Sequence, residues 1–302
     1  MDIGDEYAEL LDLVPALQGN RVVTELFGGL TNRNLKIDVG GKSYVARIST
    51  NESSLLAIDR DHEYENSKRA ALAGVGAPVV DYVPGRGILV IDFLPGRTYG
   101  PGDIGNVDNY PKMATALRAL HSGPRFVNDF NMFEIQRRYL NVVEAHGFRL
   151  PMRYLSFMPQ VKAIRRALEV LDEGTVPCNN DLLPGNFMDD GQKVWLIDYE
   201  YSGNNDPCFE LGNMWAEASL PPENLEALVH AYYGEHRPEK IARARLLALV
   251  GKYGWTLWAS IQASVSPLDF DFWSWGMDKF ERASAEFDSA EFEGWLDTAA
   301  GR

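Results

Sequence analysis

The chain has 302 residues, 45% of them hydrophobic and 24% charged, a composition that supports a folded core and excludes a disordered or fibrous protein. Its 29 basic and 43 acidic residues give a formal net charge of −14. Because such a surface repels polyanions, we expect no nucleic-acid partner. No apolar run approaches the roughly 18 residues of a membrane span, and the N-terminus lacks a secretory pattern, so we expect a cytoplasmic protein without a membrane partner.

The chain up to about residue 93 is predicted to be rich in strands, with a single helix. Short runs of Val, Ile, Leu and Tyr are separated by the pairs Gly28-Gly29 and Gly40-Gly41, as tight hairpin turns require. The expected strands are 21–27, 33–39, 43–49, 78–83 and 87–93, and the expected helix is 58–73.

From about residue 94 onward helical periodicity dominates, except for a segment of strands and loops between residues 176 and 205. A strand-rich part followed by a larger helical part is an α+β arrangement. We therefore predict two lobes, 1–93 and 94–302, with a cleft where they meet. The expected helices are 109–121, 134–145, 153–173, 224–233, 241–263 and 270–287.

The strand and loop segment carries the polar residues with the clearest chemical pattern. Asp181 and Asn186 flank a turn-forming Leu-Pro-Gly sequence, so both side chains can face one cavity, and a buried-strand run at 194–197 ends at Asp198. Carboxylate and amide oxygens are the ligands that Mg²⁺ prefers. Each residue alone is common in turns, but Asp-x-x-x-x-Asn followed by a strand that ends in Asp indicates a site.

This pattern is typical of protein kinases and of kinase-like small-molecule phosphotransferases. The wider wording, Asn-Asp-Leu-Leu-Pro-Gly-Asn at 180–186 and Ile-Asp-Tyr-Glu-Tyr at 197–201, resembles the choline/ethanolamine kinase family. The resemblance extends from about residue 28 to 280. It implies a protein-kinase-like bilobal fold, with a nucleotide-binding N-lobe at 1–93 and a catalytic, substrate-binding helical C-lobe at 94–302.

The resemblance assigns catalytic roles to Asp181 and Asn186. It implies that Asp181 orients and deprotonates the substrate hydroxyl, while Asn186 and Asp198 bind Mg²⁺ and ATP is the co-substrate. The sequence departs from the family at Asn179, where relatives usually have histidine. That side chain generally braces the loop through hydrogen bonds, which an amide can imitate.

The resemblance also assigns residues to nucleotide binding. Leu30, Thr31 and Asn32 belong to a glycine-rich hairpin whose backbone amides can approach phosphates closely. The segment around residues 91–94 matches the hinge between lobes, where the backbone groups of Asp92 and Leu94 would meet adenine.

Arg47 lies on the third expected strand, where protein kinases have lysine and choline kinase relatives commonly have arginine. A planar guanidinium can contact phosphate and carboxylate at once. Its expected partner is Glu63 on the following helix, with Glu65 as the alternative register.

The tryptophans of the last third of the chain predict the acceptor site. Trp255 and Trp258 lie opposite the apolar stripe of the 241–263 helix. A helix buried on two faces would show the same pattern, but segment 255–263 resembles the family segment that carries two choline-contacting tryptophans. The resemblance adds Trp275, Tyr201 and the acidic Glu217 to this site.

A quaternary ammonium donates no N–H hydrogen bond, so aromatic faces hold it, each contributing roughly 0.5–2 kcal/mol. Three tryptophans therefore favour choline over ethanolamine or an aminoglycoside as the small cationic alcohol. We expect Mg-ATP-dependent phosphorylation of an amino alcohol, most of all choline to phosphocholine. Ethanolamine, thiamine and aminoglycoside kinases remain alternatives, as does a pseudokinase that binds without turnover. The sequence does not indicate the oligomeric state.

Overall fold

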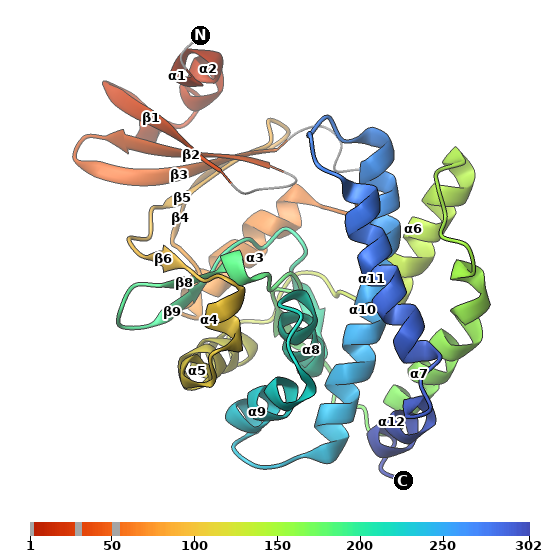
Figure 1. Cartoon of the computed structure of the whole chain (residues 1–302). Helices are drawn as coiled ribbons and strands as arrows, with labels where there is room; N and C mark the ends of the chain where they lie inside the picture. The colour runs from red at the N-terminus through yellow and green to blue at the C-terminus, as the bar shows by residue number, and fades with distance from the viewer. Residues whose placement is uncertain (1–2, 28–31, 50–54) are drawn as a thin grey trace.

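A computed structural model describes residues 3–27, 32–49 and 55–302 of the chain. A small antiparallel sheet lies at one end and a larger, mostly helical part lies beside it (Figure 1). This is the α+β arrangement that the sequence predicts. Within the described ranges, no helix combines the length and apolar character needed to cross a bilayer.

The sheet contains five antiparallel strands in the order β1-β2-β3-β5-β4. Val39 pairs with Lys42 across Gly40 and Gly41, whose φ angles are 59° and 77°. Two successive positive φ angles are the requirement of the two-residue hairpin turn that the glycine pair predicts. The strands are β1 Arg21–Leu26, β2 Asn32–Val39, β3 Lys42–Ser49, β4 Val79–Val83 and β5 Ile88–Asp92, close to the predicted bounds.

One face of this sheet is covered by two short N-terminal helices, α1 (Ile3–Glu6) and α2 (Ala8–Leu11), which the sequence analysis did not predict (Figure 1). Leu35 and Ile37 alternate along β2 and are fully buried with Leu11 in one apolar core. Helices of four residues are too short for periodicity to reveal them.

Helix α3 (Arg60–Leu72) begins at Asp59, whose carboxylate accepts hydrogen bonds from the first turn. Its buried side is largely polar: the Asn66 amide donates to the Ser202 hydroxyl at 3.0 Å. Ala70 and Val75 belong to the same apolar core as the C-terminal helices. Helix α3 is therefore anchored on the helical part, and the lobe boundary at 93/94 stays a prediction.

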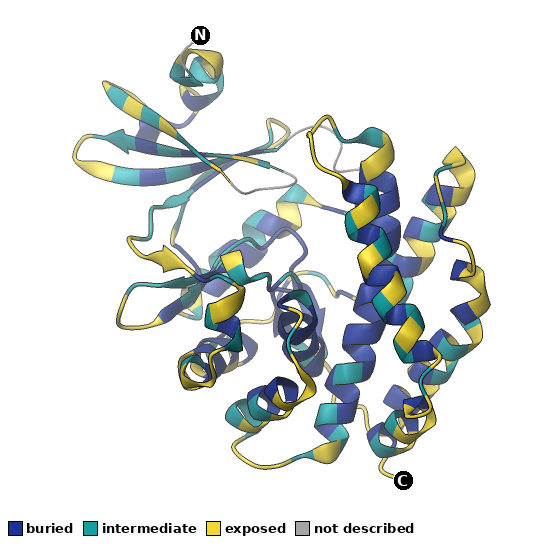
Figure 2. Cartoon of the chain, viewed as in Figure 1, coloured by how far each residue is buried: buried dark blue, intermediate teal, exposed yellow. Residues whose placement is uncertain are grey.

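The helical part is organised around α10 (Pro238–Val265), which contacts α6, α8, α11 and α12. Every residue from 246 to 262 is buried, so the helix is dark along its middle in Figure 2. Trp255 and Trp258, which lie opposite the apolar stripe, are therefore buried as well, and α10 is a helix buried on two faces, the alternative that the sequence left open. The other helices are α4 Pro101–Gly105, α5 Tyr110–His121, α6 Met132–His146, α7 Met158–Val170, α8 Pro207–Glu217, α9 Pro222–Tyr233, α11 Phe272–Phe287 and α12 Phe292–Ala299.

Two glycines allow α8 and α11 to approach α10 closely. A Cβ added to Gly212 of α8 would overlap the backbone carbonyl oxygen of Ala244, and one added to Gly276 of α11 would lie 2.5 Å from the Ala259 methyl carbon. Helix α8, which the sequence analysis did not predict, thereby places its last turn near the first turns of α11.

Short strands shape the segment between residues 176 and 205. β7 (Val176–Cys178) pairs with β10 (Gly203–Asn205), while β6 (Arg97–Thr98), β8 (Phe187–Asp189) and β9 (Val194–Leu196) form a second small sheet. The loops that connect these strands carry the polar motif found in the sequence.

Candidate active site

The loop after β7 holds Asp181 in place through the residue before it. Asn180 has a φ of 66°, a conformation that asparagine tolerates better than most residues. Its amide nitrogen donates to the backbone oxygens of Tyr201 and Gly203 at 3.1 and 3.2 Å, and its amide oxygen accepts from Asn205 at 2.9 Å. These contacts fix the backbone from which Asp181 projects.

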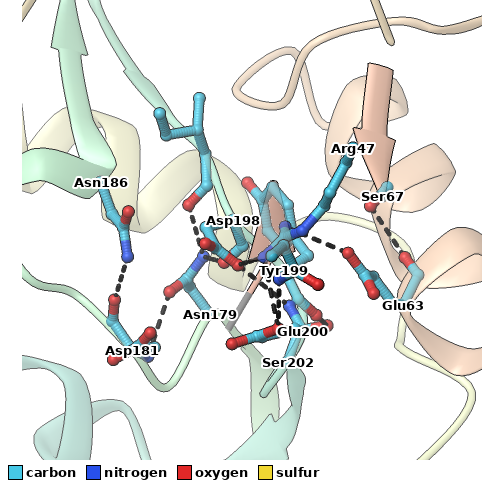
Figure 3. A network of polar contacts seen from close by, with 12 residues as sticks. Arg47, Glu63, Ser67, Asn179, Asp181, Asn186, Asp198, Tyr199, Glu200 and Ser202 are labelled. Atoms are coloured by element: carbon cyan, nitrogen blue, oxygen red, sulfur yellow. Dashed lines mark hydrogen bonds and ion pairs between the residues drawn. The ribbon is translucent and has the colours of Figure 1, made fainter. Parts of the chain in front are cut away.

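Asn179 joins this loop to the one that carries Asp198 (Figure 3). Its side-chain nitrogen donates to the backbone oxygen of Asp198 at 2.7 Å, and its side-chain oxygen accepts from the Asp181 amide at 3.1 Å. The Asn186 amide donates to the Asp181 backbone oxygen at 2.6 Å. Asp181, Asn186 and Asp198 are therefore brought together, and the Asn179 amide supplies hydrogen bonds that brace the loop.

Beneath the Asp181 loop lies a buried carboxylate that the sequence analysis missed. One oxygen of Glu210, on α8, accepts hydrogen bonds from the backbone amides of both Asn179 and Asn180. Its other oxygen lies 2.7 Å from His121 Nε2. Cys178 is close enough for the three side chains to form a possible metal-ligand group, but both Glu210 oxygens are already engaged. This cluster therefore supports the loop.

Arg47 on β3 reaches across to the Asp198 loop (Figure 3). Its guanidinium lies 2.5 Å from the Asp198 carboxylate, 3.1 Å from Glu63 and 3.3 Å from Glu200. The predicted pairing with Glu63 is confirmed, while Glu65 pairs with a neighbouring lysine on the surface of α3.

Two further members of this network, Arg60 and Glu200, had no assigned role in the sequence analysis. Arg60 lies 2.6 Å from Glu63 and 3.2 Å from Glu200. Asn32 donates to Glu200 at 2.8 Å and accepts from Arg60 at 2.9 Å. These contacts connect the start of β2 with helix α3 and the Asp198 loop, through the ion pairs of Arg60 and the hydrogen bonds of the neutral Asn32.

Burial and neighbouring charges oppose each other in their effect on the pKa of Arg47 and act together on the pKa of Asp181. Burial alone would lower the pKa of the Arg47 guanidinium, but the carboxylates of Asp198, Glu63 and Glu200 outweigh burial and raise it. Burial raises the pKa of Asp181 well above its usual range, and the negative charges of Asp198 and Glu200 raise it further. Asp181 is therefore a more basic carboxylate than one in water.

The remaining predicted nucleotide contacts lie at the sheet. Leu30 and Thr31 lie outside the described residues. The Asp92 backbone amide donates to the backbone oxygen of Pro78 at 2.9 Å and is therefore engaged within the protein. The groups of this hinge segment that would meet adenine are the Asp92 carbonyl and backbone groups of Leu94.

The predicted acceptor residues Tyr201, Trp255, Trp258 and Trp275 meet one another, and we call them the aromatic cluster. The Trp258 indole donates to the Tyr201 hydroxyl at 2.8 Å, and its ring centroid lies 5.5 Å from that of Trp275. The rings of Tyr201 and Trp255 are edge to face with centroids 5.1 Å apart. Trp255 and Trp258 are each only 5% exposed, whereas Trp275 is partly exposed.

Glu217, the predicted acidic residue of the acceptor site, is paired with a cation of the protein itself. Both of its oxygens lie 2.6–2.7 Å from the Lys279 ammonium on α11. The charges of Glu217 and Lys279 both act on the pKa of Asp181, which Glu217 raises and Lys279 lowers. The aromatic cluster therefore has an ion pair beside it, within electrostatic reach of the predicted catalytic carboxylate.

The donor set of this site suits a hard divalent cation. The Asn186 amide and the Asp198 carboxylate offer oxygen ligands from adjacent loops, and Asp198 has a φ of 66°, which re-aims the chain at the end of β9. A small antiparallel sheet beside a larger helical part, with this Asp-Asn-Asp cluster braced between loops, defines a protein-kinase-like phosphotransferase.

Comparison with known proteins narrows this class to a family. The choline/ethanolamine kinase profile matches residues 23–232. The crystal structure of a choline/ethanolamine kinase family protein from Mesorhizobium loti superimposes with a TM-score of 0.84 at 30% identity, covering 99% of both chains. The chain therefore belongs to the choline/ethanolamine kinase family and is an ATP-dependent small-molecule kinase.

Curated relatives carry two kinds of name. Protein LicA of Haemophilus influenzae is 28% identical in an alignment 249 positions long, which covers 78% of this chain and 72% of that protein. Human Ethanolamine kinase 1 is 27% identical in an alignment 316 positions long, which covers 90% of this chain and 69% of that protein.

The residues missed by sequence reasoning have weak local signals. Arg60 stands one helical turn before Glu63, and Lys279 stands one turn after Trp275, so each shares a helix face with a predicted site residue. Their decisive partners, Glu200 and Glu217, are distant in sequence and come from other elements.

Proposed function

We propose that the protein transfers the γ-phosphoryl group of ATP to the hydroxyl of choline, with ethanolamine as the second acceptor. The aromatic cluster close to Asp181 is the observation that carries this choice. A quaternary ammonium offers no N–H donor, so the faces of aromatic rings are the groups best suited to hold it. The family and the relatives named for ethanolamine kinase activity support the second acceptor.

In the proposed reaction Asp181 accepts a hydrogen bond from the acceptor hydroxyl. It takes the proton as the oxygen attacks the γ-phosphorus in line and ADP leaves. The raised pKa of its carboxyl suits this role, because a general base works best when its pKa lies nearer the operating pH.

Asn186 and Asp198 are the residues proposed to hold Mg²⁺. When bound, the cation would neutralise the charge that develops on the phosphates. Arg47 sits 2.5 Å from Asp198 and projects from the sheet that is proposed to bind the nucleotide, so it is placed to contact the same phosphates. Asn32 and the backbone of Asp92 and Leu94 complete the proposed nucleotide contacts, with Leu30 and Thr31 proposed from the sequence.

The other acceptors have less support from these residues. An aminoglycoside carries several ammonium and hydroxyl groups and calls for many acidic partners, whereas the one predicted acidic acceptor residue, Glu217, is already paired with Lys279. No observation on the described residues favours thiamine. The pseudokinase alternative conflicts with a complete Asp181, Asn186 and Asp198 set.

Detection of the product by ³¹P NMR tests the proposal. Incubation of the protein with ATP, Mg²⁺ and choline should give phosphocholine, and ethanolamine should give phosphoethanolamine more slowly. Asp181→Asn, which keeps the size of the side chain and removes the base, should abolish both products. The proposal is wrong if neither product forms with the wild-type protein, or if Asp181→Asn turns over at the wild-type rate.

The aromatic cluster needs its own variant. Trp275→Leu keeps an apolar side chain at the partly exposed member of the cluster and removes the aromatic face. Loss of one such face should raise the KM for choline while the KM for ATP stays unchanged. An unchanged KM for choline would remove Trp275 from the acceptor site.

A further inference from the structure

Lys279 makes with its own protein the contacts that a substrate ammonium would make. Its nitrogen lies 2.6 and 2.7 Å from the two oxygens of Glu217 and 4.2 Å from the centre of the Trp275 ring. The side chains of Lys279 and Glu217 are only 5% and 7% exposed. Carboxylate and aromatic face are both engaged by this one internal cation.

The pair is held between two helices that converge on α10. Glu217 is the last residue of α8, and Lys279 lies in the second turn of α11, one turn beyond Trp275. Gly212 and Gly276 let these two helices approach α10 closely. The position of the ion pair is thus set by the same packing that places Trp258 against Trp275.

An incoming acceptor would find it costly to replace Lys279. Removing one partner of a buried ion pair leaves the other charge desolvated and unpaired, which is strongly unfavourable. A quaternary ammonium cannot compensate, because it has no N–H to donate to Glu217. A primary ammonium could donate such bonds, but it would have to share with Lys279 a carboxylate whose charge is already balanced.

We propose that Lys279 is a specificity-determining residue of the acceptor site. It stays on Glu217, cancels the charge of that carboxylate and leaves the aromatic faces that it does not itself cover as the main partners of the acceptor's cationic head. Such a site favours a methylated, weakly hydrated ammonium over a primary ammonium that needs hydrogen-bond acceptors. This inference rests on the proposed function, since it concerns the choice between choline and ethanolamine.

The selectivity ratio, which is kcat/KM for choline divided by kcat/KM for ethanolamine, is the decisive quantity. In Lys279→Met the Glu217 carboxylate becomes available to the primary ammonium. Because a hydrogen bond to a charged group contributes about 1.5–3 kcal/mol, the ratio should fall about tenfold or more. Lys279→Arg keeps the internal cation and should keep the ratio close to the wild-type value.

A double variant separates this role from a purely structural bridge between α8 and α11. Glu217→Gln with Lys279→Met removes both charges together, so no unpaired charge remains and the ratio should return toward the wild-type value. A structural bridge would lower kcat/KM for both acceptors alike and leave the ratio unchanged in every variant.

A binding measurement without turnover accompanies the kinetics. The thermal stabilisation of the protein by ethylammonium, relative to tetramethylammonium, should increase in Lys279→Met. Circular dichroism checks folding. If Lys279→Met does not fold, the double variant supplies the test: a ratio close to the wild-type value is expected, and a ratio that has fallen tenfold overturns the inference.

Failure of the inference is distinguishable from failure of the proposed function. A wild-type protein that phosphorylates neither alcohol contradicts the function and the inference with it. A wild-type protein that phosphorylates either alcohol, with the same ratio in Lys279→Met, contradicts the role of Lys279 alone.

Discussion

Truncation of Glu210 should damage the active-site loop without touching the nucleotide, acceptor or metal contacts. Its carboxylate is fully buried, and one oxygen accepts from the backbone amides of Asn179 and Asn180, next to Asp181. In Glu210→Ala two buried N–H groups lose their partner. At about 1–3 kcal/mol for each unsatisfied donor, the free energy of unfolding should fall by about 2–6 kcal/mol.

The kinetic effect should appear in kcat. Because a displacement of about 1 Å in a positioned group can cost about a hundredfold in rate, we expect kcat to fall about 10–100-fold. The KM for ATP should change little, because the Arg47 network has no contact with Glu210. Urea unfolding and steady-state kinetics with choline measure the two effects.

Glu210→Gln is the matched control. The amide oxygen can still accept from both backbone amides, and the amide nitrogen can donate to His121, which lies 2.7 Å from the present carboxylate. This variant should lose less than about 2 kcal/mol of stability, since no buried donor is abandoned. A Glu210→Ala protein as stable and as active as the wild type would refute the reasoning.

Two further changes test the ion network and the helix crossing. Arg47→Met leaves the buried Glu63 with one cationic partner instead of two, so the free energy of unfolding should fall by about 3–5 kcal/mol. The KM for ATP should rise, and a KM for ATP equal to that of the wild type would exclude Arg47 from nucleotide binding. Gly212→Ala places a methyl group on the carbonyl oxygen of Ala244 and should lower the free energy of unfolding by about 1–3 kcal/mol or more. Gly251→Ala is the control, because its new methyl group would meet only ring carbons of Phe209 at 3.7 and 3.9 Å. This variant should be as stable as the wild type or more stable in urea unfolding.

The parts of the fold that sequence reasoning recovered are those with a local physical signal. The Gly40-Gly41 hairpin follows from the positive φ angles that only glycine adopts readily, and the five strands follow from short runs of Val, Ile, Leu and Tyr between turn residues. Helix α8 was missed because it is buried nearly throughout, with the polar Glu210 and Asn213 among its buried residues. The second apolar face of α10 also reflects burial by neighbouring helices, and the acceptor role of its tryptophans stays a prediction.

The site residues follow the same rule: those with a local sequence pattern were predicted, and pairings across distant elements were not settled. The spacing of Asp181, Asn186 and Asp198 lies within one short segment, so the sequence could bring them together before the structure did. The choice of Glu63 over Glu65 depends on how α3 is rotated against β3, and this rotation is set by tertiary contacts. Glu217 and Lys279 are 62 positions apart in the sequence and lie on two different helices, so no local pattern encodes their pairing.

The global charge and the local charges of this protein have different consequences for substrate choice. A net charge of −14 attracts any small cation, but choline and ethanolamine each carry a single positive charge, so the long-range field favours them equally. Only contacts inside the acceptor site can distinguish three methyl groups from three N–H donors. Lys279 is bound to both oxygens of Glu217 and balances its charge, so the aromatic faces make the distinction. They stabilise a methylated ammonium, but they do not replace the hydrogen bonds that a primary ammonium makes with water.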